Sequence, residues 1–365
     1  MNDTQMKTVL ITGSGGLVGS AAVKFYAERG WNVIGIDNNM RQKFFGLDGN
    51  IMPTLVAQSA VYDNYEWLNC DINDSIDALT HKIHKNIARR NVGPLVHIIH
   101  AAAQPSHDKA AEIPFVDFDV NARGTLNILE LVRREFPAAS MAVLSTNKVY
   151  GDNPNRLVMH HDDKRFHITE TIDGFTPAFG FNESFAVDQC LHSLFGVSKL
   201  AADMYAQEYG KYFGLNIGVF RGGCLTGPNH ASAELHGFLS YIVKCALTDR
   251  SYTIFGFDGY QVRDQIHSYD VVNALFHYLN APRPGRVYNI GGGLENSASI
   301  REIIELIELK TGKKLVYSYS EQNRMGDHKV YYTDMRRFKL DYPAWMMTYT
   351  LNDILDDIIK AHEHG

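Results

Sequence analysis

The chain has 365 residues, of which 45% are hydrophobic and 21% charged, a composition typical of a globular protein with one large domain or two unequal ones. Its formal net charge of −6 comes without a basic stripe, so a nucleic-acid partner is not expected. With neither a long apolar run nor a signal-peptide pattern, we expect no membrane span and no secretion. The cysteines contain no CxxC pair, so we expect a cytoplasmic protein with reduced thiols and no metal: Cys70, Cys190, Cys224 and Cys245.

Strands and helices alternate along the first part of the chain. The apolar, β-branched run at residues 8–12 predicts a buried parallel strand, residues 17–29 a helix, and residues 31–37 a second strand. The alternation continues, with strands expected at 95–100, 140–145 and 215–220, and helices at 115–136 and 195–213. This order is typical of a Rossmann-type, doubly wound parallel sheet in an α/β protein.

A glycine triplet, Gly13, Gly16 and Gly19, lies in the turn between the first strand and the first helix. In such a GxxGxxG turn one glycine permits the tight turn, one lets the backbone approach a pyrophosphate, and one lets helix and strand pack closely. The amide groups at the helix N-terminus then face the phosphates. Asp37, at the end of the second strand, would bind ribose hydroxyls and repel a 2′-phosphate, so NAD is favoured over NADP.

Further segments are expected to complete this cofactor site. Asp71 and Ile72 follow a third strand and would meet adenine, and the small residues of the HAAA segment would let a dinucleotide lie against the backbone. The expected cofactor contacts are therefore Gly13, Gly16, Leu17, Val18, Gly19, Asp37, Asn38, Asn39, Asp71, Ile72, Ala101, Ala102, Ala103, Asn121 and Lys199.

The second part of the chain differs from the first, because its segments are shorter and glycine and proline recur after about Gly222. We expect residues 1–222 to form the NAD-binding domain and residues 223–365 a smaller C-terminal substrate-binding lobe, with 262–293 returning to the first domain. Residues 252–255 are expected to form an edge strand that meets the base. Two long loops are expected, at 38–65 and 151–192, either functional or surface excursions.

Seven motifs occur in a characteristic order: the glycine turn, HAAA (100–103), NARGT (121–125), STNKVYGD (145–152), SK (198–199), VRDQIH (262–267) and VYNIGG (287–292). With them the chain resembles the extended short-chain dehydrogenase family of NAD-dependent epimerases and dehydratases over nearly its full length. The resemblance implies a nucleotide-sugar substrate and a homodimer formed through the helices that carry NARGT and SK.

The resemblance also implies a catalytic trio of Ser or Thr, Tyr, and a Lys four residues after the Tyr. Thr146 and Lys199 match, but the tyrosine position holds Phe195, whose ring cannot transfer a proton. Three explanations remain open: a variant with another acid/base group, an introduced substitution, or a protein that binds without turnover. We favour the first, with these expected catalytic residues: Thr146, Lys199, Tyr150 and His192. Lys148 also lies nearby.

The residues after Thr146 narrow the reaction that the resemblance implies. Dehydratases of the family place Asp-Glu there, whereas this chain has Asn147 and Lys148, so dehydration is disfavoured. STNKVYGD and the long segment after it are most similar to the CDP-paratose (CDP-tyvelose) 2-epimerases, which invert C2 through a transient ketone. Arg263 is the expected diphosphate clamp, assisted by Arg221, although either could form a structural salt bridge. The expected substrate contacts are Gln104, Asn147, Lys148, Arg221 and Arg263.

The leading hypothesis is therefore an NAD-dependent nucleotide-sugar epimerase acting at C2 of a CDP-hexose. Phe195 motivates the alternative of a non-catalytic or sensory protein that binds NAD and a nucleotide sugar. A nucleotide-sugar dehydrogenase or dehydratase is the third alternative.

Overall fold

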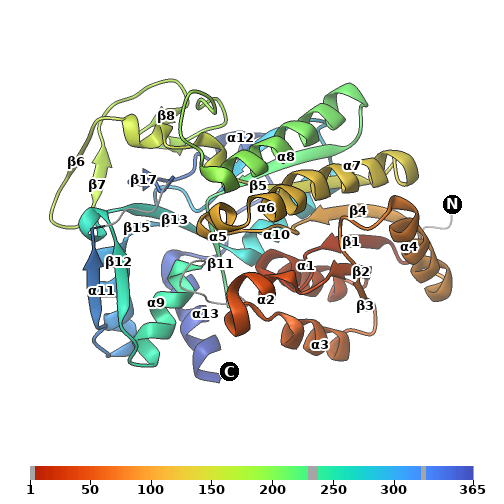
Figure 1. The fold of residues 1–365 in the computed structure, drawn as a ribbon, viewed down its shortest axis with the longest axis horizontal. Helices are drawn as coiled ribbons and strands as arrows, with labels where there is room; N and C mark the ends of the chain where they lie inside the picture. Colours follow the sequence, from red (N-terminus) through yellow and green to blue (C-terminus); the bar gives the residue numbers. More distant parts are fainter. Residues whose placement is uncertain (1–4, 229–236, 322–325, 365) are drawn as a thin grey trace.

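A computed structural model describes residues 5–228, 237–321 and 326–364. Seven strands form one parallel sheet in the order β14-β10-β5-β4-β1-β2-β3 (Figure 1). The strands are β1 (Thr8–Thr12), β2 (Asn32–Asp37), β3 (Tyr65–Asn69), β4 (Leu95–His100), β5 (Ser140–Thr146), β10 (Ile217–Gly222) and β14 (Val287–Ile290). The chain builds outward from β1 in one direction and then from β4 in the other. The expected doubly wound Rossmann-type sheet is confirmed, with its topological switch point between β1 and β4.

Helices cover both faces of the sheet because alternate residues of each strand point to opposite faces. Val9 and Ile11 of β1 belong to the core under α1 (Leu17–Ala27) and α10 (Ser268–Asn280). Leu10, between them, belongs to the core on the other face, where three helices pack: α4 (Ile76–Arg90), α7 (Gly124–Glu135) and α8 (Ser193–Tyr212). Every residue of β1 is buried, which explains why the strand reads as a continuous apolar run.

A second lobe follows β10 and has its own core. Three helices pack together there: α9 (Phe238–Leu247), α11 (Ile300–Thr311) and α13 (Leu351–His364). They cover β12 (Tyr252–Phe255), which pairs in parallel with β16 (Tyr317–Ser320). A four-stranded sheet contains β11 (Cys224–Thr226), β13 (Val262–His267), β15 (Ser297–Ser299) and β17 (Val330–Tyr331). The segment after β13 forms α10 and β14, which lie on and in the seven-stranded sheet, and α12 (Arg336–Asp341) packs against β14.

The two stretches expected as long loops contain regular structure. Residues 38–65 form α2 (Met40–Phe45), the 3₁₀ helix η1 (Gly46–Gly49) and α3 (Met52–Val61), a helix that starts with a proline in its first turn and buries Leu55. Residues 151–192 form a 3₁₀ turn, η4 (Asn153–Arg156), and two small hairpins: β6 (Met159–His161) with β7 (Phe166–Ile168), and β8 (Phe175–Thr176) with β9 (Gly180–Phe181). Phe175 and Phe181 help to form a fourth apolar cluster with β17.

The helical stretch expected at residues 115–136 is divided. It consists of α6 (Pro114–Phe118), one π turn, η2 (Asp119–Arg123), and α7. Two shorter elements lie beside the carboxyl ends of β4 and β5, namely α5 (His107–Glu112) and the 3₁₀ turn η3 (Asn147–Tyr150), and η5 (Phe257–Gly259) follows β12. No helix of the described residues is long and apolar enough to cross a membrane.

Candidate active site

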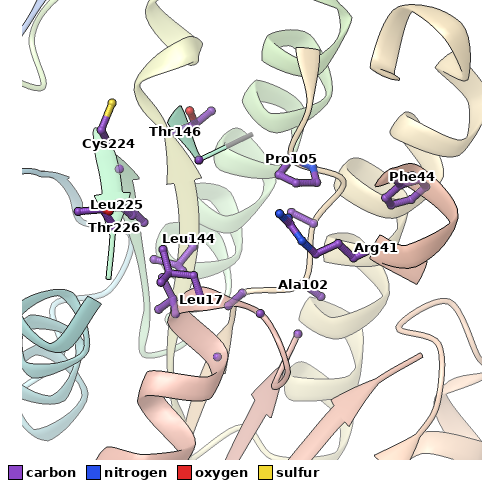
Figure 2. A pocket seen from close by; sticks show the side chains of 18 of the residues that line it. Leu17, Arg41, Phe44, Ala102, Pro105, Leu144, Thr146, Cys224, Leu225 and Thr226 are labelled. Atoms are coloured by element: carbon purple, nitrogen blue, oxygen red, sulfur yellow. The ribbon is translucent and has the colours of Figure 1, made fainter. Parts of the chain in front are cut away.

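A cavity of about 790 Å³ opens where the carboxyl ends of β1, β4 and β5 meet the second lobe. Figure 2 shows Arg41 and Phe44 of α2 on one side of it and Cys224 and Leu225 of β11 on the other. Ligands bind at this position in doubly wound folds because the strand order reverses there and leaves a crevice.

Each of the three glycines in the turn occupies a position where a side chain would have a different effect. Gly13 has a φ of +70°, and a Cβ there would lie 2.8 Å from the amide nitrogen of Ala102. A Cβ on Gly19 would lie 1.9 Å from the Gly13 carbonyl oxygen, so this glycine lets α1 pack against the turn. A Cβ on Gly16 would meet protein only at 3.4 Å, and Gly16 is the N-cap of α1 with no side chain capping it. The Gly16 amide itself donates to the Gly13 carbonyl oxygen (3.0 Å), so the groups open to an anion are the amides of the first turn of α1 that follow it.

Asp37 is held beside this turn. Its Oδ2 accepts a hydrogen bond from the Gly15 amide (3.0 Å), and its Oδ1 accepts one from the Asn39 amide (2.9 Å). Burial raises the pKa of Asp37 above its usual value, although these amide bonds oppose the change. A glycine cradle next to a carboxylate fits the pyrophosphate and ribose hydroxyls of NAD.

Most of the expected cofactor residues line the cavity: Gly13, Gly16, Leu17, Val18, Gly19, Asp37, Asn38, Asp71, Ile72, Ala101, Ala102, Ala103 and Lys199. Two others lie behind the lining. Asn39 organises the α2 region, because its side chain bonds to Gln42, Asn50 and the Ile51 amide. Asn121 is fully buried and bonds to Gln104 and Ser198. These two side chains hold residues around the cavity in place and do not themselves line it.

Thr146, Lys199 and Phe195 line the cavity together. Lys199 lies one helical turn after Phe195, and its Nζ donates a hydrogen bond to the Leu144 carbonyl (2.7 Å). Burial lowers the pKa of Lys199 to about 8, and the carboxylates of Asp203 and Asp117 limit the change. The Thr146 hydroxyl accepts a bond from the Lys148 amide (3.2 Å). Phe195 is 7% exposed, so its ring is part of the cavity floor.

The structure places two of the catalytic candidates outside the cavity lining. Tyr150 is fully buried, and its hydroxyl donates to Asn289 Oδ1 (2.7 Å) and accepts from Arg221 (3.2 Å). The His192 ring lies behind η3, with Nε2 2.9 Å from the Val149 carbonyl oxygen. Both side chains hold the η3 region in place, and neither faces the cavity.

Two expected substrate contacts are likewise structural. Arg221 forms a two-point ion pair with Asp203, with distances of 2.9 and 3.0 Å, and both side chains are buried. Gln104 is fully buried and bonds to Asp117 and to the backbone of Ser106. Both side chains are paired in the interior, which offsets the free-energy cost of burying their polar groups.

The remaining substrate candidates, Asn147, Lys148 and Arg263, line the cavity. Asp327 also lines it: its Oδ1 lies 2.6 Å from Arg263 Nη2 and 3.3 Å from Lys148 Nζ. Although burial alone would raise it, the pKa of Asp327 is held far below its usual range by these two cations. Two cations around one carboxylate leave one positive charge in excess, which suits a phosphate group.

The cavity lining that contains Arg263 and Asp327 also contains buried polar groups without protein partners. Within the described residues, both polar atoms of Gln265, the Oε1 of Gln261 and the Thr226 hydroxyl are buried without a hydrogen-bond partner. All three residues line the cavity beside Tyr252 and Phe255. Buried polar groups are normally paired, so this wall is shaped for a polar ligand or ordered water.

Among the cavity residues that sequence reasoning missed are Arg41, His107 and Asp327. Arg41 of α2 carries a cation into the cavity, and burial lowers the pKa of this side chain to about 10. His107 follows the HAAA segment by a few residues, which was the available signal. No sequence signal pointed to Asp327, because this residue reaches the cavity from a segment outside every motif. No group of three or more potential metal ligands occurs among the described residues.

A parallel sheet that presents a glycine turn and an acidic strand end to one cavity defines the dinucleotide-binding α/β class. Residues 9–291 match the model of the NAD dependent epimerase/dehydratase family. The chain belongs to this family, and NAD is its cofactor.

Proteins similar to the chain include nucleotide-sugar epimerases and dehydratases. The CDP-paratose 2-epimerase of Salmonella typhi is 30% identical over 339 residues, which cover 90% of this chain and 91% of the relative. The putative UDP-glucose 4-epimerase of Methanocaldococcus jannaschii is 27% identical, with 90% of each chain covered. The solved UDP-glucuronic acid 4-epimerase of Bacillus cereus, in complex with UDP-glucuronic acid and NAD, has a TM-score of 0.74 at 22% identity, covering 98% of this chain and 99% of that one.

Proposed function

We propose that this protein is an NAD-dependent epimerase that inverts C2 of a CDP-hexose through a transient ketone. The main support for this proposal is that the two residues after Thr146 in the sequence, Asn147 and Lys148, line the cavity. A neutral amide and an ammonium bound to Asp327 cannot replace the two carboxylates of a dehydratase. The similarity to a CDP-paratose 2-epimerase supports the choice of C2 and of cytidine diphosphate.

Each part of the site has a task in this reaction. The first-turn amides of α1, which follow Gly16, would hold the pyrophosphate of NAD, and the Asp37 carboxylate would hold its ribose. NAD supplies reversible hydride acceptance, so an epimerase consumes none of it overall. Arg263 and Lys148 would bind the substrate diphosphate, and Gln265 and Thr226 would pair with hydroxyl groups. Lys199 would orient the nicotinamide ribose, as the resemblance implies.

The test is proton NMR of the purified protein with NAD and CDP-paratose, following the sugar anomeric signals over hours. We expect the C2 epimer to appear without net NADH. Stoichiometric NADH with an oxidised sugar would establish a dehydrogenase, and a 4-keto-6-deoxy product would establish a dehydratase. If saturation transfer shows that the sugar binds and no signal changes, the binding-protein alternative raised by Phe195 replaces the proposal.

Removing Arg263 should weaken nucleotide binding. Because charge-assisted hydrogen bonds contribute about 1.5–3 kcal/mol, Arg263→Met should raise the Kd of CDP roughly 10- to 100-fold in calorimetric titration. Lys148 remains as a partner for Asp327, so the variant should still fold. The matched control is Arg156→Met, which removes an exposed ion pair with Asp152 and should leave the Kd unchanged. Equal affinities in the two variants would contradict the clamp.

We also propose a cytoplasmic homodimer that pairs through α7 and α8. Several large apolar side chains of α8 are exposed in the single chain: Leu194, Val197, Met204, Tyr205 and Tyr212. Light scattering at micromolar concentration should give about twice the chain mass of 41.1 kDa. Val197→Asp should halve that value, because a charge would be buried in the interface. A monomeric mass for the unmodified chain would exclude the dimer.

A further inference from the structure

The position of His107 is fixed by a network behind the cavity. His107 is the first residue of α5, and the Ser106 hydroxyl caps this helix by accepting a bond from the Lys109 amide (3.3 Å). Gln104 bonds to both the amide and the carbonyl group of Ser106, at 2.6 and 2.8 Å. Two buried side chains therefore hold the backbone that presents His107.

The His107 ring lies against the ring that occupies the tyrosine position. The centroids of His107 and Phe195 are 4.9 Å apart, and the rings are inclined by 58°. Both residues line the cavity together with Thr146 and Lys199. The imidazole therefore lies beside the place where a phenol would exchange a proton in the family trio.

Ser193 orients the imidazole. Its hydroxyl oxygen is 3.0 Å from His107 Nδ1, and it also accepts a bond from the Gly196 amide (3.3 Å). Ser193 has a φ of +61°, a left-handed conformation that is unfavourable for a residue other than glycine. Strain of this kind persists where surrounding contacts demand it, and it gathers at functional sites.

The other candidate groups have other roles in the proposed function or do not line the cavity. The Lys148 ammonium is bonded to Asp327 and to the Gly326 carbonyl, and the Lys199 ammonium to the Leu144 carbonyl. Tyr150 is sealed in the interior, and His192 is tied to the Val149 carbonyl. An imidazole accepts and returns protons readily near neutral pH.

We infer that His107 is the acid/base residue that replaces the missing phenol, an inference that rests on the proposed function. The neutral imidazole takes the proton of the reacting sugar hydroxyl while the C–O bond becomes a carbonyl. The hydrogen on that carbon leaves with its electron pair for the oxidised NAD that the proposed function supplies. In the reverse half-reaction the hydride returns to the opposite face of the carbon, and the imidazolium gives its proton back to the oxygen. No other oxidant or reductant is needed.

The kinetic test compares His107→Gln in two backgrounds. In the unmodified chain it should lower the rate of CDP-paratose epimerisation about 10²- to 10⁴-fold, the usual effect of losing a general base. The Kd values of NAD and CDP should change less than about 3-fold, since a proton-transfer group contributes little to binding. In a chain that also carries Phe195→Tyr the loss should be under about 10-fold, because the phenol then serves as the base. Retained activity in His107→Gln, or an equal loss in both backgrounds, would overturn the inference.

A second measurement separates this inference from the choice of substrate. Diethyl pyrocarbonate acylates accessible imidazoles, and peptide mass spectrometry reports each histidine. NAD and CDP together should protect His107, whereas His81, which is exposed on α4, should react equally with and without them. If CDP-paratose is not turned over and His107 is protected, the proposed substrate fails and the placement of His107 stands. Unchanged acylation of His107 while both ligands bind would overturn the inference.

Discussion

Replacing Arg221 by methionine should lower the free energy of unfolding by about 3–5 kcal/mol, because it leaves the buried Asp203 carboxylate without its cation. The pair joins α8 to β10 in the interior, and Asp203 also accepts a hydrogen bond from Ser145 of β5 (2.7 Å). Despite burial, the Asp203 carboxylate holds the pKa of Arg221 above its usual value, so the guanidinium is charged at any working pH. Urea denaturation followed by circular dichroism measures the change.

The matched control removes the neutral neighbour of the same group. Tyr150→Phe deletes the hydroxyl that joins Arg221 to Asn289 and should cost only about 1 kcal/mol, the net value of a typical hydrogen bond. NAD affinity of the folded protein should be unchanged in both variants. A loss of less than about 1 kcal/mol in Arg221→Met would show that water or a rearranged neighbour compensates Asp203. A large loss of CDP affinity without destabilisation would return Arg221 to the substrate site.

Gly16→Ala should weaken NAD binding about 10- to 100-fold, while the melting temperature of the protein without NAD stays the same. The added methyl group meets protein only at 3.4 Å, but it occupies the space in which the backbone would approach the pyrophosphate. Quenching of intrinsic tryptophan fluorescence during titration with NAD measures the affinity.

Gly19→Ala is the contrasting variant in the same turn. Its methyl group would lie 1.9 Å from the Gly13 carbonyl oxygen, so α1 must shift. We expect the free energy of unfolding to fall by about 1–3 kcal/mol, the usual cost of overpacking. If Gly16→Ala destabilises the protein and binds NAD normally, the assignment of the two glycines is wrong.

Much of the cofactor half of the site could be predicted because its signals are local. Thr8–Thr12 is apolar and β-branched, the glycine turn follows directly, and Asp37 ends the next strand. In a parallel sheet these strand ends meet at one edge, so neighbours in the sequence pattern become neighbours in space. The structure places thirteen of the fifteen expected cofactor residues in the cavity lining.

The chemistry could not be predicted in the same way, because it depends on contacts between distant segments. Tyr150 and Asn289 are 139 positions apart in the chain, and His107 and Ser193 are 86 apart. A motif states which residue types are present, but it does not say whether a polar side chain faces the cavity or pairs in the interior. Arg221 and Tyr150 have the right chemistry for a site, but in the interior Arg221 pairs with Asp203 and Tyr150 bonds to Asn289.

The sequence by itself determined the parallel sheet, the NAD cradle and the absence of a tyrosine four residues before Lys199, because each follows from residue type and short-range spacing. The tertiary structure alone decided which cations face the cavity and which are neutralised inside. It also brought His107, the first residue of α5, into ring contact with Phe195 of α8. The order of the strands in the sheet brings these separate segments together at the switch point, and a local sequence pattern cannot predict this proximity.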